Sequence, residues 1–101
     1  MANKGDYKEI GAANTFTDWV NVMDSASDFN FLTAIGGTWA GTVTVQLKRE
    51  GEADSTAWDV KTYTANDVEK GSLGAGGLVV RAGFKTGEYT SGTANILVKS
   101  Q

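Results

Sequence analysis

The strongest constraint on the fold is an alternation of apolar and polar residues in two neighbouring segments. Residues 42–48 alternate valine or leucine with threonine, glutamine and lysine, and residues 58–64 alternate again. In the second run we expect Trp58 and Val60 on the inward face and charged residues on the outward face. A period of two with β-branched residues is typical of a strand with one buried face. The polar segment 50–55 between the runs therefore predicts a β-hairpin.

Shorter runs of the same kind lie on both sides of this hairpin. They predict strands at 16–22, 29–35, 78–85 and 93–99, while residues 66–70 fit either a short strand or a turn of helix. The chain has 13 glycines and no proline, so we expect glycine at 36–37, 71–77 and 87–92 to supply the turns. The pattern predicts an all-β fold, an antiparallel β-sandwich of jelly-roll or immunoglobulin-like type with about seven short strands.

The N-terminal residues 1–14 are polar and contain charges of both signs. This composition predicts an N-terminal arm that is either disordered or ordered only against a neighbouring molecule. The remaining residues 15–101 then form a single domain, because a chain of 101 residues leaves no room for a second one.

Composition argues against several functions. The chain contains no histidine and no cysteine, which removes the usual catalytic bases, the best nucleophile and the usual ligands of zinc and iron. We therefore expect no enzyme activity, no catalytic residues, no metal and no cofactor. A net charge of −3 argues against nucleic-acid binding, and the absence of a long apolar run argues against a membrane span or a signal peptide.

Three local patterns suggest binding sites, and each has a simpler interpretation. The carboxylates of residues 50–54 are spaced like the start of a calcium loop, but Ser55 replaces the required glycine and Lys61 replaces the final acid. The glycines of 71–77 lack the Gly-Lys-Ser/Thr ending of a phosphate loop. The tryptophans and tyrosines fit sugar stacking or, more simply, the core of a small sandwich. We interpret the first as a hairpin tip and the second as a loop.

Four segments resemble small virion proteins of tailed bacteriophages. They are the Gly-Thr-rich strand 37–49, the Trp-Asp-Val strand 58–60, the Tyr-Thr-Ala-Asn segment 63–66 and the Gly-Glu-Tyr-Thr-Ser-Gly-Thr-Ala segment 87–94. The hairpin tip 49–55 departs from the family by being longer and more acidic. The resemblance implies a β-sandwich component of a phage particle, with a head decoration or cement protein favoured over a tail component.

Such a protein acts on the capsid surface of a virion assembled in the host cytoplasm. The resemblance implies the major capsid protein as partner, a homo-oligomer (trimer or dimer), and no contact with nucleic acid or membrane. The alternative is a tail or fibre-associated carbohydrate-binding or adhesion module, which would use exposed aromatic rings. Candidate partner-binding residues from the expected arm, loops and strand ends are Lys4, Tyr7, Lys8, Ile10, Trp39, Leu73 and Tyr89.

Overall fold

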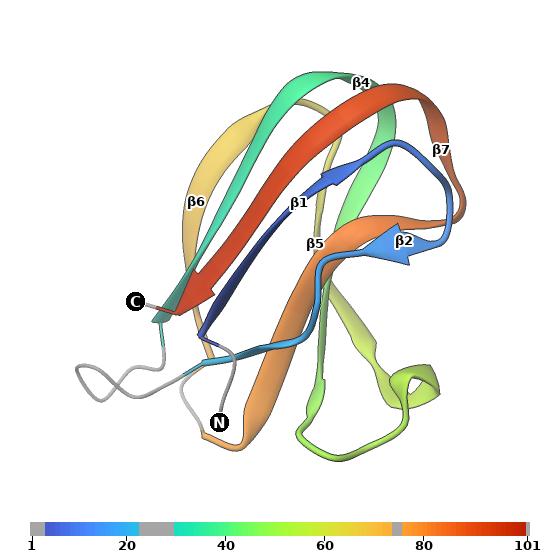
Figure 1. Cartoon of the computed structure of the whole chain (residues 1–101). Coiled ribbons are helices and arrows are strands. Elements are labelled where there is room, and N and C mark those ends of the chain that lie inside the picture. The colour runs from blue at the N-terminus through green and yellow to red at the C-terminus, as the bar shows by residue number, and fades with distance from the viewer. Residues whose placement is uncertain (1–3, 23–29, 74–75, 101) are drawn as a thin grey trace.

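The computed structural model describes residues 4–22, 30–73 and 76–100 and confirms the predicted all-β antiparallel fold. All strands join one seven-stranded sheet (Figure 1). A 3₁₀ turn η1 (Asp54–Thr56) lies in the loop before β5. The strands are β1 (Gly5–Ile10), β2 (Thr15–Phe16), β3 (Val20–Asn21), β4 (Asn30–Arg49), β5 (Trp58–Tyr63), β6 (Asp67–Ser72) and β7 (Leu78–Ser100).

Two long strands organise the sheet. β4 has 20 residues and β7 has 23, and they pair antiparallel from Arg49 opposite Leu78 to Phe31 opposite Ser100. Both strands arch over in Figure 1, so the sheet folds back on itself in two layers. Layer A contains β1, residues 91–100 of β7, residues 30–40 of β4, and β6. Layer B contains β2 and β3, residues 78–84 of β7, residues 43–49 of β4, and β5.

Glycines allow the arch, although the sequence suggested that they end strands. Gly41 pairs with Tyr89 and Val43 with Phe84, so β7 advances five residues where β4 advances two. This bulge bends both strands. A Cβ on Gly92, which has a φ of 83°, would overlap the carbonyl oxygen of Thr38. The expected turns at 36–37 and 87–92 therefore lie inside the two continuous strands.

The predicted hairpin is confirmed as β4–β5, but the inward placement of Trp58 and Val60 is wrong. Trp58 is 52% exposed and Val60 is 46% exposed. The register shifts between Val45, which pairs with Lys61, and Gln46, which pairs with Asp59. Val60 is thus the extra residue of a bulge. Because β5 pairs only with β4, it lies at the edge of its layer and stays exposed.

The N-terminal segment differs from the expected arm, since Gly5–Ile10 forms strand β1 along β7. Ile10 is 1% exposed. The backbone N–H of Asp18 donates to Asp6 Oδ2 at 2.7 Å, and Lys8 Nζ donates to the carbonyl oxygen of Phe16 at 3.2 Å. These bonds satisfy the charged side chains that the strand directs inward, which is why a polar sequence can join the sheet.

The two layers enclose one hydrophobic core. The buried side chains come from both layers and form a single cluster, with Phe84 fully buried. The members from layer A are Ile10, Phe31, Ile35, Ala94, Ile96 and Val98, and those from layer B are Val20, Val22, Val43, Val45, Tyr63, Val80, Ala82 and Phe84. No helix long and apolar enough to cross a membrane occurs in the described parts of the chain.

Candidate functional site

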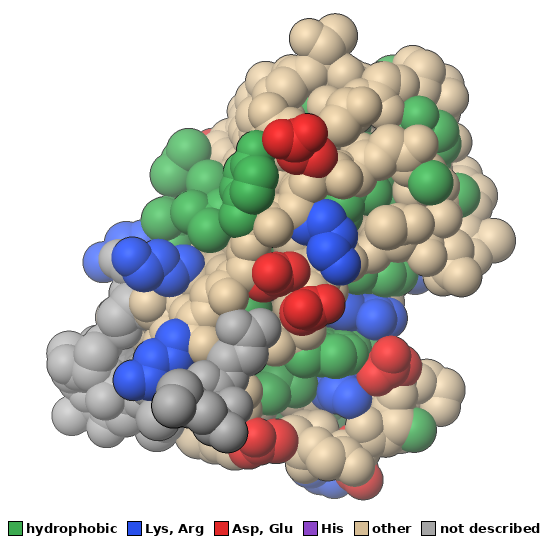
Figure 2. Space-filling model, in the orientation of Figure 1, with side chains coloured by type: hydrophobic (Ala, Val, Ile, Leu, Met, Phe, Trp, Pro, Cys, Tyr) green, Lys and Arg blue, Asp and Glu red, His purple; other side chains and the backbone are tan. Residues whose placement is uncertain are grey.

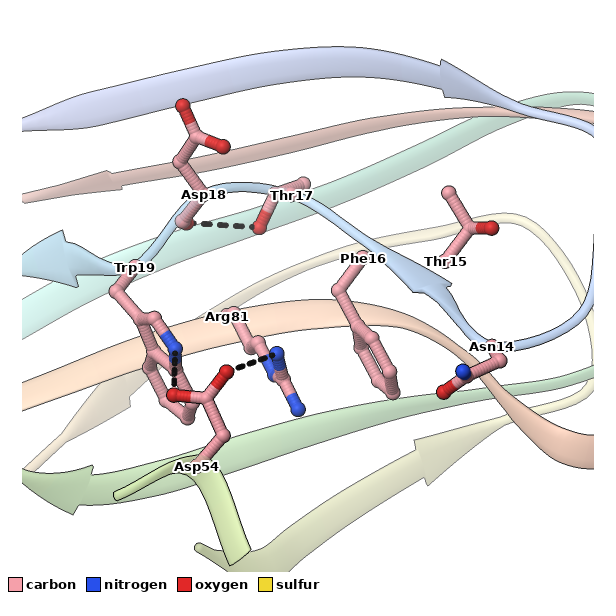
Figure 3. Close-up of a pocket in the computed structure, with 8 residues that line it drawn as sticks. All are labelled: Asn14, Thr15, Phe16, Thr17, Asp18, Trp19, Asp54 and Arg81. Carbon is pink, nitrogen blue, oxygen red and sulfur yellow. Dashed lines mark hydrogen bonds and ion pairs between the residues drawn. The ribbon is translucent and has the colours of Figure 1, made fainter. Parts of the chain in front are cut away.

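The outer face of layer B is covered by the segment that carries β2 and β3. There the guanidinium carbon of Arg81 lies 3.9 Å from the ring centre of Phe16 and 4.5 Å from that of Trp19 (Figure 3). Lys48 Nζ lies 4.7 Å from the same indole ring. Cations over aromatic rings are stabilised by the ring electrons. The stacked side chains therefore hold this segment against the sheet.

Asp54, at the start of η1, binds the members of this stack together. Its Oδ1 accepts hydrogen bonds from Lys48 Nζ at 2.9 Å and from Trp19 Nε1 at 3.0 Å, and its Oδ2 lies 3.4 Å from Arg81 Nη1. The hydrogen bond from Lys48 is the main reason why the pKa of Asp54 is lowered. Burial lowers the pKa of Arg81, while the charge of Asp54 opposes that shift. Arg81 Nε also donates to Gln46 Oε1 at 2.9 Å.

A hollow of about 570 Å³ opens beside this stack. Figure 3 shows the stacked rings and the guanidinium along its wall. Arg81 lies against both aromatic rings, and both carboxylate oxygens of Asp54 accept from neighbours. The hollow therefore lies where the segment that carries β2 and β3 packs against the rest of layer B. Its lining residues are Asn14, Thr15, Phe16, Thr17, Asp18, Trp19, Asp54 and Arg81.

A second polar group continues this face toward β5. Lys85 Nζ donates to Asp59 Oδ2 at 2.6 Å, and Gln46 Nε2 donates to Asp59 Oδ1 at 3.0 Å. The bond from Lys85 is the main cause that lowers the pKa of Asp59, and the same bond raises the pKa of Lys85. The charged side chains of this face are thus paired with one another.

The outer face of layer A carries an apolar row across four strands. The register places Tyr7 of β1 beside Leu97 of β7, Leu97 beside Ala34 of β4, and Ala34 beside Val68 of β6. Tyr7 is 54% exposed and Val68 is 67% exposed, and the two residues between them are half-buried. With strands about 4.8 Å apart, this apolar row is about 14 Å long. In Figure 2, hydrophobic side chains gather on the face that carries β1 and β6.

The charges around the apolar row are mainly basic. The next register row holds Lys99 beside Leu32 and Leu32 beside Lys70. Both lysines are exposed. On the other side of the row, Glu9 of β1 pairs with Asn95. This face therefore presents an apolar strip with a basic margin, although the whole chain has a net charge of −3.

Some of the predicted partner-binding residues are exposed, and the others are buried or bonded within the chain. Tyr7 and Lys4 are exposed, whereas Lys8 is half-buried and bonded to Phe16. Ile10 is buried in the core, so its assignment as a partner contact is wrong.

The predicted contacts that follow β1 in the sequence are only partly exposed, because they pack against the core. Trp39 and Tyr89 both meet the ring of Phe84 edge-on, with ring centres 5.6 Å and 5.1 Å away. Trp39 Nε1 donates to Asn66 Oδ1 at 2.7 Å, and the Tyr89 hydroxyl donates to the carbonyl oxygen of Gly92 at 2.9 Å. Leu73 is partly buried against the same cluster. Trp39 and Tyr89 were the rings on which the carbohydrate-binding alternative depended.

Three members of the apolar row were missed by sequence reasoning. Leu97 occupies an outward position of the run 93–99, between Asn95 and Lys99, and a leucine among polar residues was the available signal. Ala34 and Val68 gave weaker signals, because alanine is small and residues 66–70 had no clear periodicity. That these residues share one row follows from the register of four strands, which the sequence does not contain.

No group of three or more acidic side chains gathers as a metal site among residues 4–22, 30–73 and 76–100. Comparison of the chain with known protein families, curated proteins and solved structures finds no match. The apolar row and its basic margin are exposed on the described surface.

Proposed function

We propose that this chain is a non-enzymatic structural protein of a phage virion that decorates or cements the outside of the capsid. The observation that carries the proposal is the uncovered apolar row from Tyr7 to Val68, set against an opposite layer whose outer face is closed by its own side chains. Clustered exposed apolar side chains with a polar rim are a common feature of protein docking sites. The resemblance of the strand segments to small virion proteins supports a capsid as the partner.

The charge around the apolar row indicates what kind of partner surface it fits. Lys70 and Lys99 favour an acidic protein surface with an apolar centre, because complementary charge speeds encounter and disfavours wrong partners. A protein that binds the assembled shell and not free subunits stabilises the shell by mass action. Many copies on a lattice can act in this way even when each contact is small.

Co-sedimentation with shells assembled from the major capsid protein of the phage that encodes the chain tests this proposal. We expect the wild-type chain to pellet with the shells, and Val68→Asp or Leu97→Asp to weaken binding by roughly tenfold or more. Val60→Asp is the matched control, since it places the same charge on an exposed valine of layer B. The proposal is overturned if the wild-type chain stays in the supernatant, or if the row variants bind as the control does.

A further inference from the structure

Strand β1 lies at the edge of layer A. Its hydrogen bonds to β7 determine which of its backbone groups face the free side. The N–H of Ser100 donates to the carbonyl oxygen of Lys4 at 2.9 Å. In an antiparallel ladder every second residue exchanges bonds with the same neighbour, so Asp6 and Lys8 bond to β7. The backbone N–H and C=O of Tyr7 then point away from β7. Within the described chain no strand pairs with β1 on that side.

The side chains next to Tyr7 carry opposite charges. Asp6 and Lys8 both lie on the inward face of β1, one residue before and one after Tyr7. We propose that two copies of this chain form a dimer by pairing their β1 strands antiparallel around a twofold axis at Tyr7. In that arrangement the Tyr7 backbones of the two copies bond to each other, and Asp6 of each copy lies opposite Lys8 of the other.

Charge selects this register over its neighbours. A twofold axis perpendicular to the sheet must pass through one β1 residue. An axis at Asp6 sets the two Asp6 side chains directly opposite each other, and an axis at Lys8 does the same with the two lysines. Like charges directly opposite destabilise a strand pair, whereas opposite charges stabilise it. Of these three axes, only the one at Tyr7 pairs unlike charges at both flanking positions. An axis at Gly5 would also set Asp6 opposite Lys4, but it pairs β1 with residues that precede the strand, whereas the axis at Tyr7 keeps residues 5–9 paired within β1.

The existing contacts of these side chains are compatible with the pairing. Asp6 accepts the Asp18 N–H through Oδ2, and Lys8 Nζ lies 3.5 Å from Asp18 Oδ1. A carboxylate offers two oxygens and an ammonium offers three donors, so each side chain can serve a second partner. Charges that point inward on an edge strand exclude apolar strands. The charge sequence of β1 is complementary to itself, so the edge admits a second copy and excludes most other strands.

The pairing extends the surface that carries the proposed function. Tyr7 ends the apolar row at the β1 edge, so the twofold axis joins two rows into one that crosses eight strands. A single six-residue edge buries little surface, which predicts a dimer that dissociates on dilution.

Sedimentation velocity of the purified chain over a range of concentrations tests the dimer without any capsid. We expect concentration-dependent dimers for the wild-type chain and monomers for Tyr7→Pro. Proline removes the outward N–H at a position that makes no ladder bond with β7. Tyr7→Ser is the matched control, because it removes the ring but keeps the N–H, and it should still dimerise. A monomeric wild-type chain, or Tyr7→Pro dimers as strong as those of the control, would overturn the proposal.

A charge exchange provides a second test. Asp6→Lys and Lys8→Asp should each weaken the dimer by placing like charges opposite each other, and the double variant should recover at least part of the lost affinity. Double-variant dimers no tighter than those of the single variants would contradict the proposed register.

A cysteine at the axis provides a third test. Paired residues that exchange both backbone bonds have Cα atoms about 5.5 Å apart, within the range of a disulfide. Since the chain has no native cysteine, oxidised Tyr7→Cys should give covalent dimers and Val68→Cys, at the other edge of the layer, should not. Equal cross-linking of the two variants would argue against the axis. The dimer and capsid docking are separable, because a monomeric chain that still pellets with shells overturns only the dimer.

Discussion

The indole Nε1 of Trp19 donates a hydrogen bond to Asp54 Oδ1 at 3.0 Å, between residues 35 positions apart in the chain. This bond joins the segment before β3 to the 3₁₀ turn η1. Arg81, which lies between Phe16 and Trp19, ties the same two segments to β7. The outer face of layer B is thereby closed by the chain itself, while the outer face of layer A leaves Tyr7 and Val68 exposed.

Acid should destabilise the chain through Asp54. Its folded pKa is lowered, mainly by the hydrogen bond from Lys48, so the unfolded state binds the proton more readily. The stability it contributes is present above the ordinary aspartate pKa of about 3.9 and is lost as the pH falls through the lower folded value. Thermal melts at several acid pH values should show a shallower decline for Asp54→Asn than for the wild-type chain. Identical pH profiles would contradict the assignment.

Replacing Arg81 by lysine should destabilise the chain although the charge is kept. Lysine cannot stack its planar group between Phe16 and Trp19, and it loses the Nε–H bond to Gln46. We expect urea denaturation to show a loss of about 1–2 kcal/mol. Lys70→Arg on the exposed edge strand is the control and should change the free energy of unfolding little. Equal effects of the two substitutions would mean that the stack is energetically neutral.

The same substitution at two buried threonines should have opposite effects. Thr33 is 2% exposed, and its Oγ1 has no hydrogen-bond partner in the described structure. Thr33→Val should therefore raise the free energy of unfolding by about 1 kcal/mol, because it removes an unsatisfied polar atom. Thr17 Oγ1 accepts from the Ala82 N–H and donates to the Asp18 carbonyl oxygen, both at 3.2 Å. Thr17→Val should lower it by about 1–3 kcal/mol, as measured by urea denaturation of both variants.

A methyl group should be costly at Gly83 and harmless at Gly36. A Cβ on Gly83 would overlap the carbonyl oxygen of Thr15 in the paired strand β2. Gly83→Ala must push that strand away, and we expect a loss of about 2 kcal/mol in thermal or urea unfolding. Gly36 has open space at the same atom, so Gly36→Ala is the control. A stable Gly83→Ala protein would show that the β2 pairing contributes little.

Local pattern was enough to predict the all-β class, the hairpin and the buried face of residues 42–48. The alternation in 42–48 correctly placed Val43 and Val45 in the interior. The same rule failed for Trp58 and Val60, because an edge strand with a bulge has no opposite layer to cover it. Polar composition likewise misassigned β1, because its inward charges are satisfied by Asp18 and by the backbone of Phe16 in the segment that follows it, a contact that composition does not report.

Properties that depend on long-range register could not be predicted from the sequence. Gly36, Gly37 and Gly41 look like strand ends, yet they lie within a continuous β4 because β7 bends with it. The apolar row is visible only once the register of four strands is known. Which backbone groups of β1 face outward likewise depends on its register with β7. No local signal reports that Tyr7 and Val68 occupy the same row.

The continuity of β4 and β7 through both layers has a mechanical consequence. In a sandwich of two separate sheets, a force on one sheet reaches the other through side-chain contacts and through the connecting loops. Here the same two backbones run through both layers, so a load on the outer face of layer A is carried into layer B by the main chain of two paired strands. The layers cannot slide apart unless the ladder between β4 and β7 is itself broken. A shell clamped by such a protein would be braced by main chain rather than by packing alone.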